Sequence, residues 1–206
     1  MLEHIPHWLG ALLKGARAGH NKLVVLNIAK GTPRIDLSSP AFADGARLPV
    51  RFTADGAGVS PPLVWGVLPE GTASLALVVE DPDAPFPEPA SHAVVWRLPP
   101  ETQHLPEGAI VADGDGSASG DVGKATRGLE GWLPPDPPNG HGTHDYVFQL
   151  FALNAEPELV PNPKRKDLVA AITGHVIGAG VLTGTYSRGE EGDDENDQAA
   201  GAAAPA

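Results

Sequence analysis

The chain has 206 residues, a net charge of −12, no cysteine, 25 glycines and 22 prolines. The absence of cysteine excludes disulfides, thiolate chemistry and cysteine-ligated zinc. The length suits one domain with a substantial core. The high glycine and proline content favours a mostly β fold with many turns over a helical bundle.

The negative charge is divided between the body and the end of the chain. Residues 189–206 carry six acidic side chains and no base, which leaves −6 for the other 188 residues. This segment is typical of a disordered acidic tail. An acidic body repels phosphate backbones, so nucleic-acid binding is not expected. No apolar run reaches the roughly 18 residues of a membrane span, and no signal-peptide layout is seen, so we expect a cytoplasmic protein without integral membrane association.

The first 22 residues have the pattern of an amphipathic helical extension. Lys14 and Arg17 follow its apolar side chains, which recur at helical spacing: Ile5, Trp8, Leu9, Leu12 and Leu13. We expect this helix to dock on the domain or on a second subunit, which makes a homodimer reasonable. A helix lying on a membrane surface is the alternative, disfavoured by the small number of bases.

Residues 23–188 form the predicted domain. Short β-branched apolar runs between turn residues predict buried strands at 74–81, 92–98 and 145–153. An outer strand is expected at 48–53 and a last strand at 180–188. One helix is expected, with Asn162 as its N-cap and Pro163 at its first position. Its apolar side would consist of Leu168, Val169, Ile172 and Val176.

Two cofactor motifs were tested and rejected. A phosphate-binding loop at 118–125 fails because Ala118 replaces its first glycine and Ala125 replaces its serine or threonine. His141 and His144 are three residues apart, a spacing suited to zinc on a helix, but here they flank Gly142 before a strand. We therefore predict no cofactor and no metal site.

Polar residues gather where three predicted strands begin or end. Asp81 and Asp83 follow the strand at 74–81, His92 opens the next, and His144 and Tyr146 open the strand that follows. Residues two apart share one face of a strand, so His144 and Tyr146 point the same way. Each residue alone has a structural explanation as a turn, surface or core residue. Together they predict a site at one end of a sheet.

These segments resemble the phosphatidylethanolamine-binding protein family, most closely its bacterial, Raf-kinase-inhibitor-like branch. The resemblance rests on "DPDAP" at 81–85, the strand-opening His92 and "PDPPNGHGTHDYVFQLFAL" at 135–153. It extends over residues 35–188 and implies an antiparallel β-sandwich with few peripheral helices and a small pocket for anions such as phosphate or phosphorylated head groups.

The resemblance also implies a set of ligand-binding residues and no catalytic residue. The pocket wall would consist of Asp81, Asp83, His92, His144 and Tyr146, with Pro135, Pro137 and Pro138 as a rigid rim. The two histidines would donate to phosphate oxygens, and the two aspartates would suit the ammonium of a zwitterionic ligand. His141 has no role in this scheme.

Three functions remain open from the sequence. The first is a ligand-binding or regulatory module for a small phosphorylated or anionic ligand, or for a phosphorylated protein partner. The second is an inhibitor of kinases or proteases that acts through its surface. The third is an enzyme that uses Asp and His as acid and base, which is disfavoured because no serine or cysteine nucleophile stands beside the histidine in these motifs.

Overall fold

The computed structural model describes residues 11–13, 15–113 and 120–188 and contains two antiparallel sheets. The larger sheet has the order β6-β4-β3-β7-β8. Its strands are β3 (Ser74–Asp81), β4 (Ala90–Leu98), β6 (Asp121–Val122), β7 (His144–Leu153) and β8 (Val176–Tyr186). The smaller sheet has the order β1-β2-β5. Its strands are β1 (Leu37–Ser38), β2 (Leu63–Trp65) and β5 (His104–Leu105).

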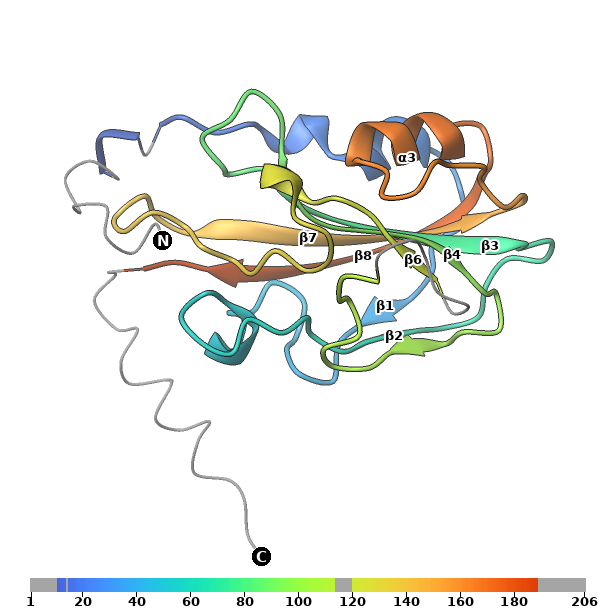
Figure 1. Cartoon of the computed structure of the whole chain (residues 1–206), viewed down its shortest axis with the longest axis horizontal. Coiled ribbons are helices and arrows are strands. Elements are labelled where there is room, and N and C mark those ends of the chain that lie inside the picture. The colour runs from blue at the N-terminus through green and yellow to red at the C-terminus, as the bar shows by residue number, and fades with distance from the viewer. Residues whose placement is uncertain (1–10, 14, 114–119, 189–206) are drawn as a thin grey trace, which may run out of the picture.

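The large sheet lies between the small sheet and a layer of short helices (Figure 1). The helices are α2 (Val24–Ile28) and α3 (Arg165–Ile172), with 3-10 turns at His20–Lys22, Val50–Phe52 and Thr126–Gly128. Alternate residues of β3 fill the two interfaces: Leu75, Leu77 and Val79 face the small sheet, while Ala76 and Val78 pack under α2 and α3. The predicted antiparallel β-sandwich is confirmed. In the described ranges, no helix has the length and apolarity needed to cross a membrane.

The helix expected across residues 1–22 is not confirmed. Residues 1–10 and 14 lie outside the described part, as does the expected acidic tail at 189–206. Residues 11–13 are helical, but residues 16–19 are not, and His20–Lys22 is a single 3-10 turn. Gly19 has φ of +105°, which a helix does not allow. The N–H groups of Ala18 and Gly19 instead donate to Ala84 O and Pro82 O, so the segment is tied to the β3–β4 loop.

Two smaller expectations are also corrected. Residues 50–52 form a 3-10 turn and not an outer strand, because Pro49 starts a turn in which the N–H of Phe52 donates to Pro49 O. Helix α3 begins at Arg165 with Lys164 as its N-cap, and Asp167 accepts from the Lys164 N–H at 3.0 Å. Leu168 and Ile172 are buried as expected. The expected Val176 instead begins β8, and Asn162 has φ of +56°.

A buried ion pair joins the helical layer to the large sheet. Glu80 of β3 has no exposed surface and pairs with Arg165 of α3. Its Oε2 atom also accepts from the backbone N–H of Val24 at 2.9 Å and from Gln149 Nε2 at 2.7 Å. A buried carboxylate without partners is costly, so these contacts fix α2 and α3 on the sheet next to Asp81.

We expect Glu80→Ala to lower the free energy of unfolding by about 3–5 kcal/mol, because it leaves a charged arginine and two N–H donors without their acceptor. Chemical denaturation measures this loss. Glu107→Ala is the control, since the side chains of its partner Arg51 and of Glu107 itself are both nearly half exposed. It should cost at most about 1 kcal/mol. Equal losses in the two variants would contradict the structural role of Glu80.

Candidate functional site

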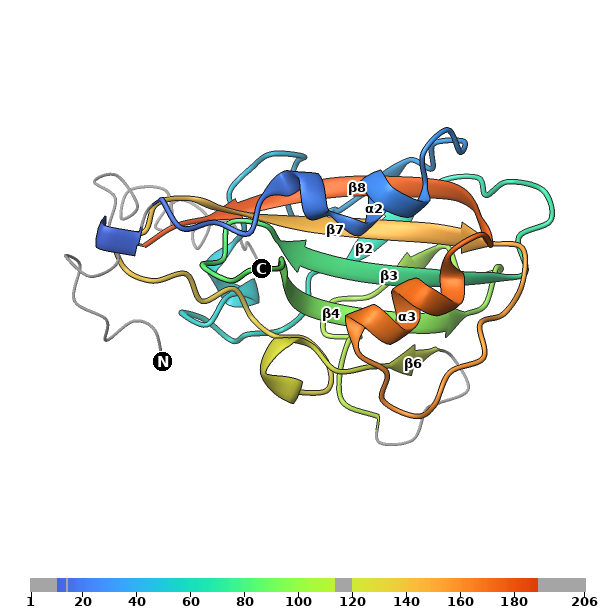
Figure 2. The same ribbon diagram turned by 90° about the horizontal axis from the view of Figure 1, so that it is seen from above.

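A cavity of about 250 Å³ opens where β3 ends and β4 and β7 begin. Antiparallel pairing brings these strand ends together, since Asp81 lies opposite Ala90 and Glu80 opposite Val147. Figure 2 shows the three strands side by side. The polar floor is formed by Asp81, His92, His144 and Tyr146. The remaining lining residues are mostly apolar or on the rim: Leu13, Ala84, Pro85, Phe86, Ala90, Thr126, Arg127, Leu133, Pro134, Asp136, Pro137 and Pro138.

A β-bulge coincides with His92. The pairing of β3 with β4 moves from Val79–Ala93 to Glu80–Ser91, so His92 has no partner on β3. Such an extra residue bends the strand and re-aims its side chain. The imidazole Nδ1 of His92 donates to Leu133 O at 2.6 Å, and the N–H of Leu133 donates back to His92 O at 2.8 Å. This reciprocal pair joins the bulge to the proline-rich loop and leaves His92 Nε2 facing Asp81, 4.0 Å from Oδ2.

A continuous row of hydrogen bonds crosses the floor of the cavity. The Oδ1 atom of Asp81 accepts from the backbone N–H of Asp83 at 2.8 Å, and Oδ2 lies 2.8 Å from His144 Nδ1. His144 Nε2 lies 2.7 Å from His141 Nδ1, and His141 Nε2 lies 2.8 Å from Leu13 O. Gly142, with φ of +99°, makes the turn that brings the two rings together.

The row engages all four ring nitrogens of the two histidines. Acceptors stand at both ends, a carboxylate oxygen of Asp81 that faces His144 Nδ1 and the carbonyl of Leu13, to which His141 Nε2 donates. Burial and the neighbouring His144 lower the pKa of His141. Both ring nitrogens of His144 have partners within the protein, and the expectation that it donates directly to a ligand stays a prediction.

His92 and Tyr146 present polar atoms that the protein leaves available. Burial lowers the pKa of His92, although the charge of Asp81 opposes this shift. The neutral ring donates from Nδ1 to Leu133 O, so its Nε2 is an acceptor at the cavity. The Tyr146 hydroxyl is fully buried and has no hydrogen-bond partner among the described residues. Burial and the charge of Asp81 raise the pKa of Tyr146, which keeps its hydroxyl a neutral donor.

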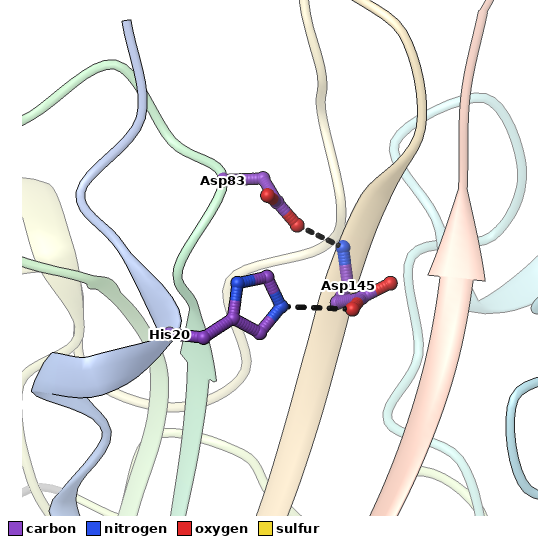
Figure 3. Close-up of side chains that lie close together, drawn as sticks. All are labelled: His20, Asp83 and Asp145. Carbon is purple, nitrogen blue, oxygen red and sulfur yellow. Dashed lines mark hydrogen bonds and ion pairs between the residues drawn. The ribbon is translucent and has the colours of Figure 1, made fainter.

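Two of the predicted site residues, Asp83 and Pro135, do not line the cavity. One carboxylate oxygen of Asp83 pairs with the Arg17 guanidinium, and the other accepts from the Asp145 N–H at 2.8 Å. Figure 3 shows that His20 lies beside this pair, with its Nε2 2.9 Å from Asp145 Oδ2. His20, Asp83 and Asp145 have the spacing of metal ligands. Because the positively charged Arg17 guanidinium already pairs with Asp83, a metal cation does not fit at this position.

The proline-rich loop is held as a rim by Arg188, which follows β8. Its guanidinium donates to Asp136 Oδ1 at 2.5 Å, to Pro137 O at 3.1 Å and to Asp55 at 2.6 Å. These carboxylates raise the pKa of Arg188, so it stays charged. Pro137 and Pro138 line the cavity, together with Pro134 and Asp136.

Sequence reasoning missed four residues that shape the site: Arg17, Arg127, His141 and Arg188. Arg127 lines the cavity and lies 4.0 Å from Asp136, in a 3-10 turn where its φ is +70°. Nothing in the sequence around Arg127 indicates that its φ is positive. His141 could have been suspected from its spacing to His144, since rings three residues apart can meet at a glycine turn.

The fold and site define a β-sandwich protein with a small pocket whose polar floor lies at one end of its main sheet. A family model described as phosphatidylethanolamine-binding protein matches residues 38–187. A UPF0098 protein of Methanothermobacter thermautotrophicus is 39% identical over 157 residues, which are 75% of this chain and 100% of that protein. LppC of Mycobacterium tuberculosis, named as a lipoprotein, is 39% identical over 152 residues, 74% of this chain and 72% of that protein.

Solved structures give the same family. Escherichia coli YbcL, described as a member of the mammalian PEBP family, has a TM-score of 0.71 and 26% identity, over 76% of this chain and 99% of that chain. A homologue of phosphatidylethanolamine-binding protein from Chlamydia trachomatis has a TM-score of 0.68 and 31% identity, over 77% of this chain and 100% of that chain. This chain belongs to the phosphatidylethanolamine-binding protein family. Because one relative is named a lipoprotein, the cytoplasmic location stays a prediction.

We expect the free energy of unfolding to fall when the pH is lowered from 7.5 to 5.5 in the absence of ligand. The lowered pKa values of His92 and His141 mean that the unfolded chain binds more protons once the pH falls below the ordinary histidine pKa of about 6.5. Urea denaturation at both pH values measures the difference. His92→Gln should make it smaller, and His104→Gln, at an exposed position, should not. A stability that is the same at both pH values would refute this assignment.

Proposed function

We propose that this chain binds a small anionic ligand, phosphate or a phosphorylated organic group, in the cavity between the ends of β3, β4 and β7. The observation that carries the proposal is the Tyr146 hydroxyl. It is a buried donor on the cavity floor without a protein partner among the described residues. Such a group lowers the stability of the fold unless a ligand or water accepts a hydrogen bond from it.

The charges around the cavity support an anion. A floor with free carboxylates would repel phosphate, but Asp81 is hydrogen-bonded to the His144 ring and to the Asp83 N–H, and Asp136 is paired with Arg188. Arg127 adds a partly exposed positive charge on the lining. An anion entering the cavity therefore meets the guanidinium of Arg127 and the hydroxyl of Tyr146, while the carboxylates of the lining already have partners within the protein.

His92 gives this binding a pH dependence. When the ring is neutral, its Nε2 can accept a hydrogen bond only from a protonated phosphate oxygen. When the ring is charged, Nε2 donates a hydrogen bond to a phosphate oxygen and attracts the anion. Because the pKa of His92 is lowered, the ring gains its charge below the ordinary histidine pKa. Affinity for an anion should therefore increase as the pH falls from 8.5 to 5.5. Equal affinity at these two values would contradict the role of His92.

The cavity size limits the ligand. Its volume of about 250 Å³ lies below the roughly 300–1,000 Å³ of ordinary small-molecule sites. The site suits a compact molecule such as a head group, and the acyl chains of a whole phospholipid would have to remain outside.

Tyr146→Phe tests the proposal. We expect the variant to bind phosphate or a phosphate ester about tenfold more weakly, because it loses one hydrogen bond to a charged acceptor. Its stability without ligand should equal or exceed that of the native protein, since the lost hydroxyl has no partner. Calorimetric titration and chemical denaturation give the two readouts.

Tyr186→Phe is the matched control, because the Tyr186 hydroxyl donates to Asp55 outside the cavity. It should leave affinity unchanged and lower stability. If millimolar phosphate and phosphate esters do not bind the native protein, or if both tyrosine variants bind equally, the proposed function fails.

A further inference from the structure

Residues 11–13 and 15–22, here called the N-terminal strap, pass beside the cavity, and Leu13 of the strap is part of its lining. The carbonyl of Leu13 accepts from His141 Nε2, and the Arg17 guanidinium pairs with Asp83 and donates to Thr143 O at 3.1 Å. Lys22 Nζ donates to Pro87 O at 2.6 Å. The strap is thus fixed to the β3–β4 loop and to the loop that precedes β7.

The strap lies outside the part of the chain that the family model matches, which begins at residue 38. The whole UPF0098 protein of M. thermautotrophicus aligns with only 157 of the 206 residues. What the strap contributes to the cavity therefore does not follow from the family match.

Arg17 removes the acceptor that an ammonium group would need. Both oxygens of Asp83 are engaged, one by Arg17 and the other by the N–H of Asp145. The two oxygens of Asp81 are likewise engaged, by the N–H of Asp83 and by His144. A ligand ammonium at this end of the sheet would meet carboxylates that are already paired, with a guanidinium next to one of them. Like charges at this spacing repel.

Leu13 adds an apolar wall. Leu13 lines the cavity together with Phe86 of the β3–β4 loop and Leu133 of the proline-rich segment. Phe86 is about half exposed and Leu13 about a third exposed, so a ligand can still cover apolar surface of both. Covering such surface favours an apolar ligand group, and a charged group would be desolvated there without a partner.

We propose that the strap sets the ligand class: the cavity takes a compact anion that carries an uncharged, apolar organic group, and it discriminates against zwitterionic phosphoethanolamine. Arg17 pairs with Asp83 next to the cavity, so that carboxylate does not attract a ligand ammonium, and Leu13 contacts the organic group. The inference rests on the proposed anion binding and makes it specific.

Three probes separate the parts of the proposal: inorganic phosphate, phenyl phosphate and O-phosphoethanolamine, each titrated calorimetrically into the full chain at pH 7. All carry the same anion, and only the substituent differs. The native protein should bind phenyl phosphate on the order of tenfold more tightly than O-phosphoethanolamine, because only the phenyl ring gains from apolar burial.

Leu13→Ala should weaken phenyl phosphate about fivefold and leave inorganic phosphate within about twofold. Leu12→Ala is its control, since Leu12 is 73% exposed and does not line the cavity. Arg17→Met should leave the Asp83 carboxylate, next to the cavity, without its cation and shift the preference towards O-phosphoethanolamine by about fivefold, because the uncompensated charge attracts the ammonium. Arg51→Met is its control, since Arg51 pairs with Glu107 away from the cavity and should leave the preference unchanged.

The outcomes distinguish two failures. If no probe binds the native protein, the proposed function itself is wrong and this inference falls with it. If all probes bind but phenyl phosphate and O-phosphoethanolamine are equal, the anion site stands and the ligand class is overturned. A Leu13→Ala variant that weakens inorganic phosphate as much as phenyl phosphate would also overturn it, because Leu13 would then shape the site and not its specificity.

Discussion

The buried carboxylate of Asp81 is the constraint on which the site depends. A carboxylate without water must be paired, and its two oxygens draw in the Asp83 backbone and the His144 ring. The other ring nitrogen of His144 contacts His141, and His141 in turn donates to the carbonyl of Leu13. One charge at the end of β3 therefore orders the start of β7, the glycine turn before it and the strap from the beginning of the chain.

The antiparallel sheet explains how a few residues that are distant in sequence form this site. Strands β3, β4 and β7 are neighbours, so their polar residues reach one edge although they lie up to 65 residues apart along the chain. The bulge in β4 adds the adjustment that regular pairing does not allow: it turns His92 towards Asp81 while Val79 and Glu80 remain paired on either side. On β3, Glu80 directly precedes Asp81, faces the opposite layer and anchors α2 and α3. Consecutive acidic residues thus serve the two faces of the sheet.

Much of this architecture could be predicted from local patterns, and the rest depended on distant partners. The strands at 74–81 and 145–153 were correct because their apolar runs are bounded by turns, and the motif residues do meet at one sheet end. The helix expected over residues 1–22 does not continue through Gly19, because backbone hydrogen bonds to the β3–β4 loop take the place of helical ones there. Asp83 was expected in the pocket, but its partner Arg17 is 66 residues earlier in the sequence, and no local pattern encodes that pairing.

The pairing of charges explains why a cavity rich in acidic neighbours can still suit an anion. Asp81 is hydrogen-bonded to His144, Asp83 pairs with Arg17, and Asp136 pairs with Arg188. Charges of opposite sign largely cancel at close range, so a ligand would meet chiefly other groups of the described lining, among them the Tyr146 hydroxyl, His92 Nε2 and the guanidinium of Arg127. The hydroxyl and the guanidinium carry protons whatever the state of His92, and His92 joins them as donors when the pH falls. In the proposed binding, the carboxylates of the motif therefore hold rings and guanidinium groups in place, and the donors that they position contact the anion.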